Sequence, residues 1–303
     1  MVFSTIAQSY FDEFPFRRRA RRKPSSGYFF LSHAHSDHTS GIKSSLTDPD
    51  ATIVCSKETE AVIRVIYDIP PEKCLVIKPN QSLDFDKFIV HAVDANHCLG
   101  SIIFVIESKE GLKEVYTGDF RLGSPIFDEL SLIKGANHLW VDYTYGKDPI
   151  FQFPSREVLI SQIISFILQD ENYPERDVWI AAYQIGKELL LKTISEALKI
   201  KIWASDQKVK VYKEIGGEWD IFTNDTDSGV FVGSRRTVEG LYGIKKQYQA
   251  KMSDALRISP TGWSARLQKK HLDVHFFPYS DHCSYSEVHK FIELVTAERI
   301  TKI

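Results

Sequence analysis

Short apolar runs separated by turns occupy the first half of the chain. Residues 28–31 form an apolar run typical of a buried strand, and apolar alternation predicts further strands over 88–95, 101–107 and 114–120. The links between the last three runs are short and contain glycine, so we expect these strands to form a meander. A further apolar run, over 138–145, contains an acid at its end.

The pattern changes beyond residue 153. Ser155 is expected to cap a helix, because the apolar residues after it repeat at helical spacing. Strands then alternate with helices, and this alternation predicts a second, parallel α/β unit over 154–257. Its expected strands cover 177–182, 199–203 and 229–232, and its second helix covers 186–198. An earlier helix is expected after Ser56 and a last one before the C-terminus.

The first apolar run stops in a cluster of metal-ligand side chains. His33, His35, Asp37 and His38 follow residues 28–31 directly. In extended backbone, side chains two apart share a face, so His33 and His35 can bind one metal ion. Asp37 and His38 follow where the chain turns and can face a second ion. Imidazole and carboxylate suit zinc, and two neighbouring ions make a hydrolytic site.

Three later segments add candidate ligands. His97 lies in a turn after the strand over 88–95, and Asp119 lies at the end of the strand over 114–120. A carboxylate has two oxygens, so Asp119 can bridge two ions. His282 lies before the final helix, where it can complete the second ion's coordination. We expect structural or surface roles for the remaining histidines, which are His91, His138, His271, His275 and His289.

Charge singles out one segment before the metal-ligand cluster. The formal net charge of −2 argues against a basic coat over the whole protein. Residues 17–23 nevertheless carry six positive charges in seven positions. Because this run precedes a hydrolytic motif, we predict that Arg17, Arg18 and Arg19 contact nucleic-acid phosphates.

The four cysteines, Cys55, Cys74, Cys98 and Cys283, have no paired spacing, which favours a reducing compartment over a disulfide framework. Cys98 and Cys283 each follow a candidate ligand. A thiolate ligand is conceivable at either position, but adjacent residues on a strand point to opposite faces, so we expect both to pack in the interior. No apolar run approaches the ~18 residues of a membrane span, and the first residues lack the apolar block of a signal peptide. We expect an intracellular protein without membrane contact, in the nucleus if eukaryotic and in the cytoplasm if prokaryotic.

Six blocks spread over the chain resemble one family. They are Ser-His-Ala-His-Ser-Asp-His at 32–38, Asp-Ala-Asn-His-Cys-Leu-Gly at 94–100, Tyr-Thr-Gly-Asp-Phe-Arg at 116–121, the segment from Asp142 to Arg156, Pro-Thr-Gly-Trp at 260–263, and Tyr-Ser-Asp-His-Cys-Ser-Tyr at 279–285. In this order they resemble the β-CASP metallo-β-lactamase DNA cross-link repair nucleases, the Artemis and Apollo group. The second and fifth blocks are specific to that group.

The resemblance implies an α/β fold, a metallo-β-lactamase αββα sandwich with an inserted β-CASP α/β domain. Residues 1–153 would form the first part of the sandwich, 154–257 the β-CASP domain, and 258–303 the returning part. One or two Zn²⁺ ions are implied as cofactors. The first would be held by His33, His35, His97 and Asp119, and the second by Asp37, His38, His282 and Asp119.

Two more acids match the family's pattern. Asp12 would orient ligands of the metal site, and Asp142 could orient a ligand or relay a proton. One position departs from the pattern, because Phe231 stands where the family usually has a histidine. Phenylalanine cannot bond a phosphate oxygen or carry a proton. We expect the loss of a histidine here to affect cleavage rate, leaving-group protonation or substrate preference, and not metal binding.

The resemblance further implies a 5′-to-3′ DNA exonuclease acting in repair. It would hydrolyse phosphodiester bonds in single- or double-stranded DNA and prefer a 5′-phosphate. Such an end needs an anion pocket, which we expect where the two domains meet, lined by hydroxyls and backbone N–H groups. The candidates are Ser259, Thr261, Ser280 and Ser284.

Four alternatives remain open from the sequence. A structure-specific endonuclease of the Artemis type would share all the residues above. An RNA-processing β-CASP nuclease would share the metal ligands, although its usual insertion histidines are not evident. A catalytically weak nucleic-acid-binding scaffold would suit Phe231 and the near-neutral charge, but two clustered ions are costly to keep without use. A small-molecule hydrolase would leave the insertion and the group-specific blocks without a purpose.

Overall fold

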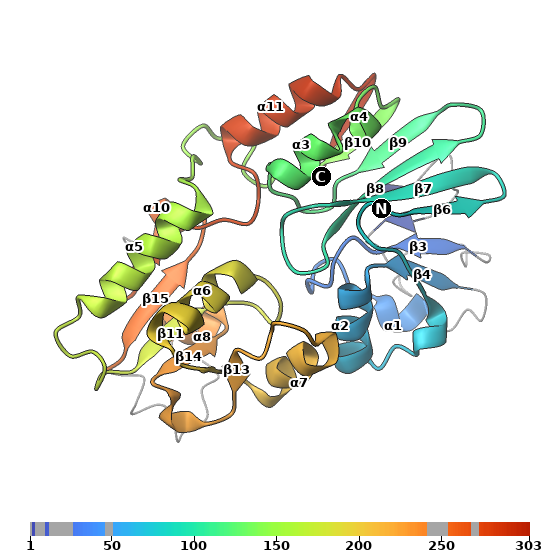
Figure 1. Ribbon diagram of the computed structural model, residues 1–303. Helices are drawn as coiled ribbons and strands as arrows, with labels where there is room; N and C mark the ends of the chain where they lie inside the picture. Colours follow the sequence, from blue (N-terminus) through green and yellow to red (C-terminus); the bar gives the residue numbers. More distant parts are fainter. Residues whose placement is uncertain (1, 4–9, 12–26, 46–50, 241–253, 268–272) are drawn as a thin grey trace. The chain divides into compact units, whose positions relative to one another are not determined.

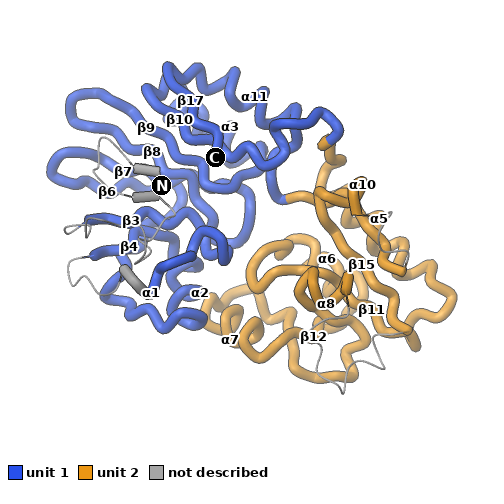
Figure 2. Tube along the Cα trace, turned by 180° about the vertical axis from the view of Figure 1, so that it is seen from behind, with its two compact units in different colours: residues 1–150, 281–303 blue, residues 151–280 orange. Residues whose placement is uncertain are grey.

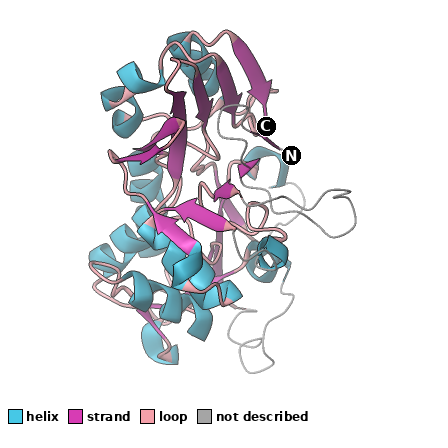
Figure 3. Cartoon of the chain, turned by 90° about the vertical axis from the view of Figure 1, so that its right-hand side faces the viewer, coloured by secondary structure: helices cyan, strands magenta, loops and turns pink. Residues whose placement is uncertain are grey.

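The computed structural model describes residues 2–3, 10–11, 27–45, 51–240, 254–267 and 273–303 (Figure 1). The chain divides into two units (Figure 2). The first comprises 1–150 with 281–303, and the second comprises 151–280. Both units contain helices and strands (Figure 3).

The first unit contains two sheets. One has the order β1-β2-β3-β4-β5, with parallel pairing from β2 onward, and the other has the order β17-β10-β9-β8-β7-β6. Strands β6 to β9 pair antiparallel, which confirms the expected meander. The strands of the first sheet are β1 (Val2–Phe3), β2 (Tyr10–Phe11), β3 (Tyr28–Phe30), β4 (Thr52–Cys55) and β5 (Cys74–Val76). Those of the second are β6 (Ser82–Phe85), β7 (Phe88–Asp94), β8 (Ile102–Ser108), β9 (Lys113–Tyr116), β10 (His138–Val141) and β17 (Arg299–Lys302).

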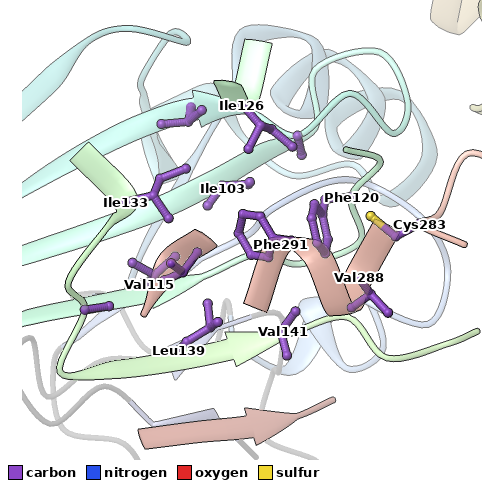
Figure 4. Packing of buried hydrophobic residues seen from close by; sticks show 14 of the residues in the cluster. Ile103, Val115, Phe120, Ile126, Ile133, Leu139, Val141, Cys283, Val288 and Phe291 are labelled. Carbon is purple, nitrogen blue, oxygen red and sulfur yellow. The ribbon is translucent and has the colours of Figure 1, made fainter. Parts of the chain in front are cut away.

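Strand β8 shows how the layers of the first unit are held together. Its alternate residues Ile103 and Val105 belong to a buried cluster that includes Phe291 of α11 (Tyr285–Val295) (Figure 4). The residues between them, such as Phe104, belong to a second cluster that includes Phe30 of β3. One face of the second sheet therefore packs on helices and the other on the first sheet.

Five α-helices lie among the described residues of this unit. Near the second sheet lie α3 (Ser124–Asp128), α4 (Leu130–Ile133) and α11, and near β3 and β4 lie α1 (Ile42–Ser45) and α2 (Lys57–Tyr67) (Figure 1). The expected αββα sandwich is confirmed. Ser56 caps α2 as predicted, because its Oγ accepts a hydrogen bond from the N–H of Thr59 at 3.0 Å.

The second unit contains one sheet in which every pair of neighbouring strands is parallel, as the alternation of strands and helices predicted. Ser155 caps its first helix through the N–H of Val158. Its strand order is β13 (Phe222–Thr223), β12 (Ile202–Trp203), β14 (Val230–Gly233), β11 (Val178–Ala181), β15 (Leu256–Pro260) and β16 (His275–Phe277). Its helices are α5 (Arg156–Leu168), α6 (Glu188–Leu198), α7 (Asp206–Ile215), α8 (Arg235–Gly240) and α10 (Ser264–Leu267).

Several limits in the structure differ from the expected ones. We expected the chain to leave the second domain after residue 257, but 258–280 belongs to the second unit, because β15 pairs with β11 and β16 pairs with β15. Helix α6 begins at Glu188 and not at residue 186. The reason is that Gly186 and Lys187 have φ values of 112° and 62°, outside the helical region.

Candidate metal centre

In the first unit, four imidazoles surround one carboxylate oxygen. Their Nε2 atoms lie 3.5 Å (His33), 3.4 Å (His38), 3.6 Å (His97) and 3.8 Å (His282) from Oδ2 of Asp119. Two ligands of one zinc ion in tetrahedral geometry lie roughly 3.3 Å apart. The spacing and the donor types therefore fit a metal centre.

His35 extends this cluster. Its Nδ1 lies 3.0 Å from Nε2 of His33 and 3.2 Å from Nε2 of His97. The ligand atoms fall into three overlapping groups, each with all its members within 4.8 Å of one another. These groups are His33, His35, His97 and Cys98; His33, His38 and Asp119; and His97, Asp119 and His282. Asp119 belongs to two of these groups, and each group could hold a metal ion.

The topology of the second sheet explains why distant residues meet. Strands β7 and β9 both pair antiparallel with β8, and β10 pairs parallel with β9. These three strands therefore run in the same direction and end at the same edge. His97, Asp119 and Asp142 each follow the end of one of them. His33 follows β3 of the first sheet, and His282 precedes α11.

Partners at Nδ1 orient three of the imidazoles. Nδ1 of His97 donates a hydrogen bond to the backbone carbonyl of Asp281 at 3.0 Å. Nδ1 of His282 lies 2.8 Å from Oδ2 of Asp142, and Nδ1 of His33 lies 3.0 Å from Oγ of Ser32. A proton at Nδ1 leaves the lone pair at Nε2, on the side of Asp119, for an ion.

The protonation of the cluster follows from burial and charge. Burial, aided by the positive charge of His282, holds the pKa of His97 well below its usual value. Burial would raise the pKa of Asp119, but the charge of His282 and hydrogen bonds from His33 and His38 hold it well below its usual value. For His282, burial opposes the charged form, yet Asp142 and Asp119 raise its pKa to about 9. A bound cation would therefore replace the proton of His282 beside an ionised Asp119.

Asp37 is far more exposed to solvent than the expected ligands around Asp119. Its side chain is 76% exposed, and its Oδ2 lies 3.9 Å from Nε2 of His38. It joins none of the three ligand groups found among the described residues. Asp12 and the basic residues Arg17, Arg18 and Arg19 lie outside the described residues.

Cys98 is the ligand-type side chain that the sequence reasoning did not bring to the site. We expected it to point away from His97 because neighbours on a strand alternate. In the structure both residues lie in a bend beyond β7, where this alternation does not apply. The turn expected at His97 was the signal that strand alternation need not apply to Cys98. Cys283 packs in the core of the first unit as expected.

The four hydroxyl candidates for phosphate binding lie in different settings. Oγ of Ser259 donates a hydrogen bond to Oε1 of Glu239 at 2.7 Å. Ser284 caps α11 in a capping box with Glu287. Thr261 and Ser280, both nearly buried, follow the carboxyl ends of β15 and β16.

Phe231 lies in the interior of the second unit. It is fully buried in β14, and its ring stacks on Trp179 with a centroid distance of 4.9 Å and an interplanar angle of 9°. Trp203 packs against the same cluster. This phenylalanine therefore contributes to the core of the second unit.

Several known proteins are similar to this chain over most of its length. The family model described as "DNA repair metallo-beta-lactamase" matches residues 222–302. Mouse "5' exonuclease Apollo" is 31% identical over 283 residues, which cover 90% of this chain and 50% of that protein. The chain belongs to the DNA repair metallo-β-lactamase family.

Other relatives in this family are longer proteins. Arabidopsis thaliana "DNA ligase 6" is 31% identical over 93% of this chain, and "DNA cross-link repair protein SNM1" of the same plant is 27% identical over 90%. The chain spans 22% and 60% of these two proteins and half of Apollo. A structure of a protein of unknown function from Enterococcus faecalis matches with a TM-score of 0.63 and 16% identity, over 91% of this chain and 75% of that one, which supports the fold alone. No described helix has the length and apolar character needed to cross a membrane.

Proposed function

We propose that this protein is a zinc-dependent DNA nuclease that acts in repair, hydrolysing DNA from a 5′ end in the 5′-to-3′ direction. The observation that carries the proposal is the convergence of four imidazole Nε2 atoms on Oδ2 of Asp119. Membership of the DNA repair metallo-β-lactamase family and similarity to mouse Apollo, a 5′ exonuclease, support DNA as the substrate. Such a substrate supports a location inside the cell, in the nucleus of a eukaryote or the cytoplasm of a prokaryote.

The residues of the cluster would hold one or two zinc ions. His33, His35, His97 and Asp119 are the proposed ligands of the first, and His38, His282 and Asp119, with Asp37, those of the second. A bound zinc ion would supply a water of lowered pKa and would neutralise charge that develops on the scissile phosphate.

The protein's own contribution is to fix the ligands before substrate arrives. Asp142 accepts hydrogen bonds from the N–H and Oγ1 of Thr144, at 2.9 and 2.7 Å, so its carboxylate is held while it orients His282. Ser32 and the carbonyl of Asp281 orient two more imidazoles in the same way. Asp37 is exposed beside His38, where it can complete the site from the solvent side.

The first experiment tests metal-dependent cleavage. The purified protein is loaded with zinc and incubated with labelled single- and double-stranded DNA and with matched RNA. We expect a time-dependent ladder from the 5′ end of DNA, loss of activity with a chelator, and loss of activity in His38→Ala. His91→Ala is the matched control, since His91 hydrogen-bonds to Ser82 and lies outside the ligand groups. Unchanged turnover in His38→Ala would refute the site, internal cutting would favour the endonuclease alternative, and preferred cleavage of RNA would favour the RNA-processing alternative.

The second experiment tests recognition of the 5′ end. We propose that hydroxyl and backbone N–H groups bind the terminal phosphate, with Thr261 and Ser280 as the leading candidates at the strand ends of the second unit. Oligonucleotides that differ only in a 5′-phosphate or a 5′-hydroxyl should be degraded at clearly different rates. Equal rates on the two ends would remove this part of the proposal while leaving metal-dependent cleavage intact.

A further inference from the structure

The carboxyl ends of the parallel strands in the second unit form one edge of its sheet. Ala181 of β11 pairs with Gly233 of β14, and Ile180 of β11 pairs with Ile258 of β15. Residues 183–187, here called the edge loop, therefore leave β11 at the same edge as Thr261 leaves β15. In open parallel α/β sheets, ligands bind outside the carboxyl ends of the strands.

A buried lysine of α7 lies behind this loop. Lys208 is 2% exposed, and its Nζ donates hydrogen bonds to the backbone carbonyls of Tyr183 at 2.9 Å and of Gln184 at 3.0 Å. The ammonium group also lies 5.0 Å from the ring centroid of Tyr212 and 5.1 Å from that of Phe222. A charge buried this deeply is costly unless it is well bonded, and the two carbonyls and the two rings meet that condition.

The other end of the edge loop is held by a buried carboxylate. Glu188, the first residue of α6, accepts hydrogen bonds from the N–H of Gly186 and from the hydroxyl of Tyr212. Tyr212 therefore contacts both Lys208 and Glu188. One network of a lysine, a tyrosine and a glutamate thus fixes the backbone of the loop between Tyr183 and Gly186.

The direction of the bound carbonyls determines which hydrogen-bond donors the edge loop presents on its other side. In a trans peptide the C=O of one residue and the N–H of the next point in opposite directions. With the carbonyl of Tyr183 on Lys208, the N–H group of Gln184 points away from it. Nε2 of Gln184 is enclosed and has no hydrogen-bond acceptor among the described residues. Lys187 adds a positive charge near the rings of Tyr183 and Tyr279, at 5.7 and 5.5 Å.

We propose that Lys208 is a positioning residue for phosphate recognition: by binding two carbonyls it turns amide donors of the edge loop toward a phosphate of the nucleic-acid substrate. This inference rests on the proposed function. Without the ammonium group the carbonyls lose their donors and can turn toward the edge, where their negative ends repel phosphate. The role is indirect, because Lys208 contacts the loop and not the phosphate.

The experiment compares three variants of the full chain. Lys208→Met keeps the apolar stem between Tyr212 and Phe222 but removes the donors and the charge. Lys208→Arg keeps the charge. Lys201→Met is the matched control, because Lys201 is half-exposed in the same unit and pairs with Asp220. Affinity for 5′-phosphorylated and 5′-hydroxyl single-stranded DNA is measured by fluorescence anisotropy in chelator, where no cleavage occurs, and KM and kcat are measured with zinc.

We expect Lys208→Met to bind 5′-phosphorylated DNA roughly tenfold more weakly, the factor that one lost charge-assisted phosphate contact would give. KM should rise by a similar factor, kcat should change much less, and Lys208→Arg should recover part of the affinity. If Lys208 were purely structural, Lys208→Met would lower the urea midpoint of unfolding without raising KM more than it changes kcat. If only the 5′-phosphorylated ligand is affected, the loop recognises the terminal phosphate; an equal effect on both ligands assigns it to internal phosphates.

The pH dependence of binding gives a second measurement that does not require a variant to fold. Burial lowers the pKa of Lys208 to about 8, with Glu188 opposing this shift and Lys187 adding to it. Tyr212 is a further titratable side chain in contact with Lys208. Wild-type affinity should therefore fall as the pH rises through about 8, and Lys208→Arg should show no such fall.

Three outcomes would overturn the proposal. It fails if folded Lys208→Met binds DNA as tightly as wild type, or if Lys201→Met loses as much affinity. It also fails if Lys208→Met does not fold and wild-type binding shows no fall near pH 8. In each of these cases the wild type still binds and cleaves DNA, so the nuclease proposal stands. If the wild type neither binds nor cleaves DNA, both proposals fall together.

Discussion

Nδ1 of His282 lies 2.8 Å from Oδ2 of Asp142, although 140 positions separate the two residues in the chain. Asp142 follows β10 and His282 precedes α11, so this contact joins the middle of the first unit's chain to its returning C-terminal segment. The contact fixes which nitrogen of His282 faces Asp119. It also raises the pKa of His282, which connects metal binding to pH.

Replacement of Asp142 should weaken the metal site without unfolding the protein. Asp142→Asn loses the charge that orients His282, and loss of such a partner typically lowers metal affinity by about 10–100-fold. Zinc affinity measured by competition with a chelator would show this. Thr144→Val is the control, since it removes a hydrogen bond to Asp142 but keeps the carboxylate. Equal affinities in wild type and Asp142→Asn would contradict the role of Asp142.

The stability of the metal-free protein should fall at alkaline pH because of His282. The pKa of His282 is about 9 in the folded chain and about 6.5 in an unfolded one. The folded state therefore holds this proton more tightly, and the stabilisation is complete below about pH 6.5. It is lost as the pH rises through about 9. Urea unfolding across this range, compared with Asp142→Asn, should show a smaller decline in the variant; parallel declines would exclude His282 as the cause.

The binding of each metal ion should require Asp119. Asp119→Asn removes a carboxylate that lies near four imidazoles, so we expect native mass spectrometry to find no stoichiometric zinc on the variant. Zinc should raise the Tm of wild type, since a ligand that binds only the folded state stabilises it, and should leave the Tm of Asp119→Asn unchanged. Retention of one ion by the variant would show that Asp119 does not bridge two sites.

Phe231 should affect stability and not chemistry. Phe231→Ala removes a fully buried ring stacked on Trp179, and the expected cost is about 3–5 kcal/mol. Phe231→His should also destabilise, because an imidazole N–H would be buried in an apolar cluster at a cost of about 1–3 kcal/mol. Urea unfolding measures both, with Phe127→Ala as the control at a 43% exposed ring of the first unit. A gain of nuclease activity in a stable Phe231→His would contradict this assignment.

The elements that were predicted correctly depend on local interactions. The meander needs only alternating apolar residues and short links, and the caps at Ser56 and Ser155 need only a hydroxyl before a helical repeat. The ligand types were equally evident, because imidazole and carboxylate side chains cluster at the ends of apolar runs. These features are encoded within a few residues of one another.

Other properties depend on which distant segments become neighbours. Ser259 bonds to Glu239 and Ser284 caps a helix, although their sequence context also suited phosphate binding. Cys98 reaches the metal ligands because the chain bends after β7. The segment 258–280 joins the second unit because β15 finds its partner in β11.

From the order of residues alone, the kinds of ligand, the strand-rich first half and the alternating α/β second half could be predicted, because side-chain chemistry and local periodicity do not depend on the rest of the chain. The pairing of His282 with Asp142, the burial of Phe231 and the enclosure of Lys208 depended on folding. Each of them requires contacts between segments whose separation in the chain carries no local signal.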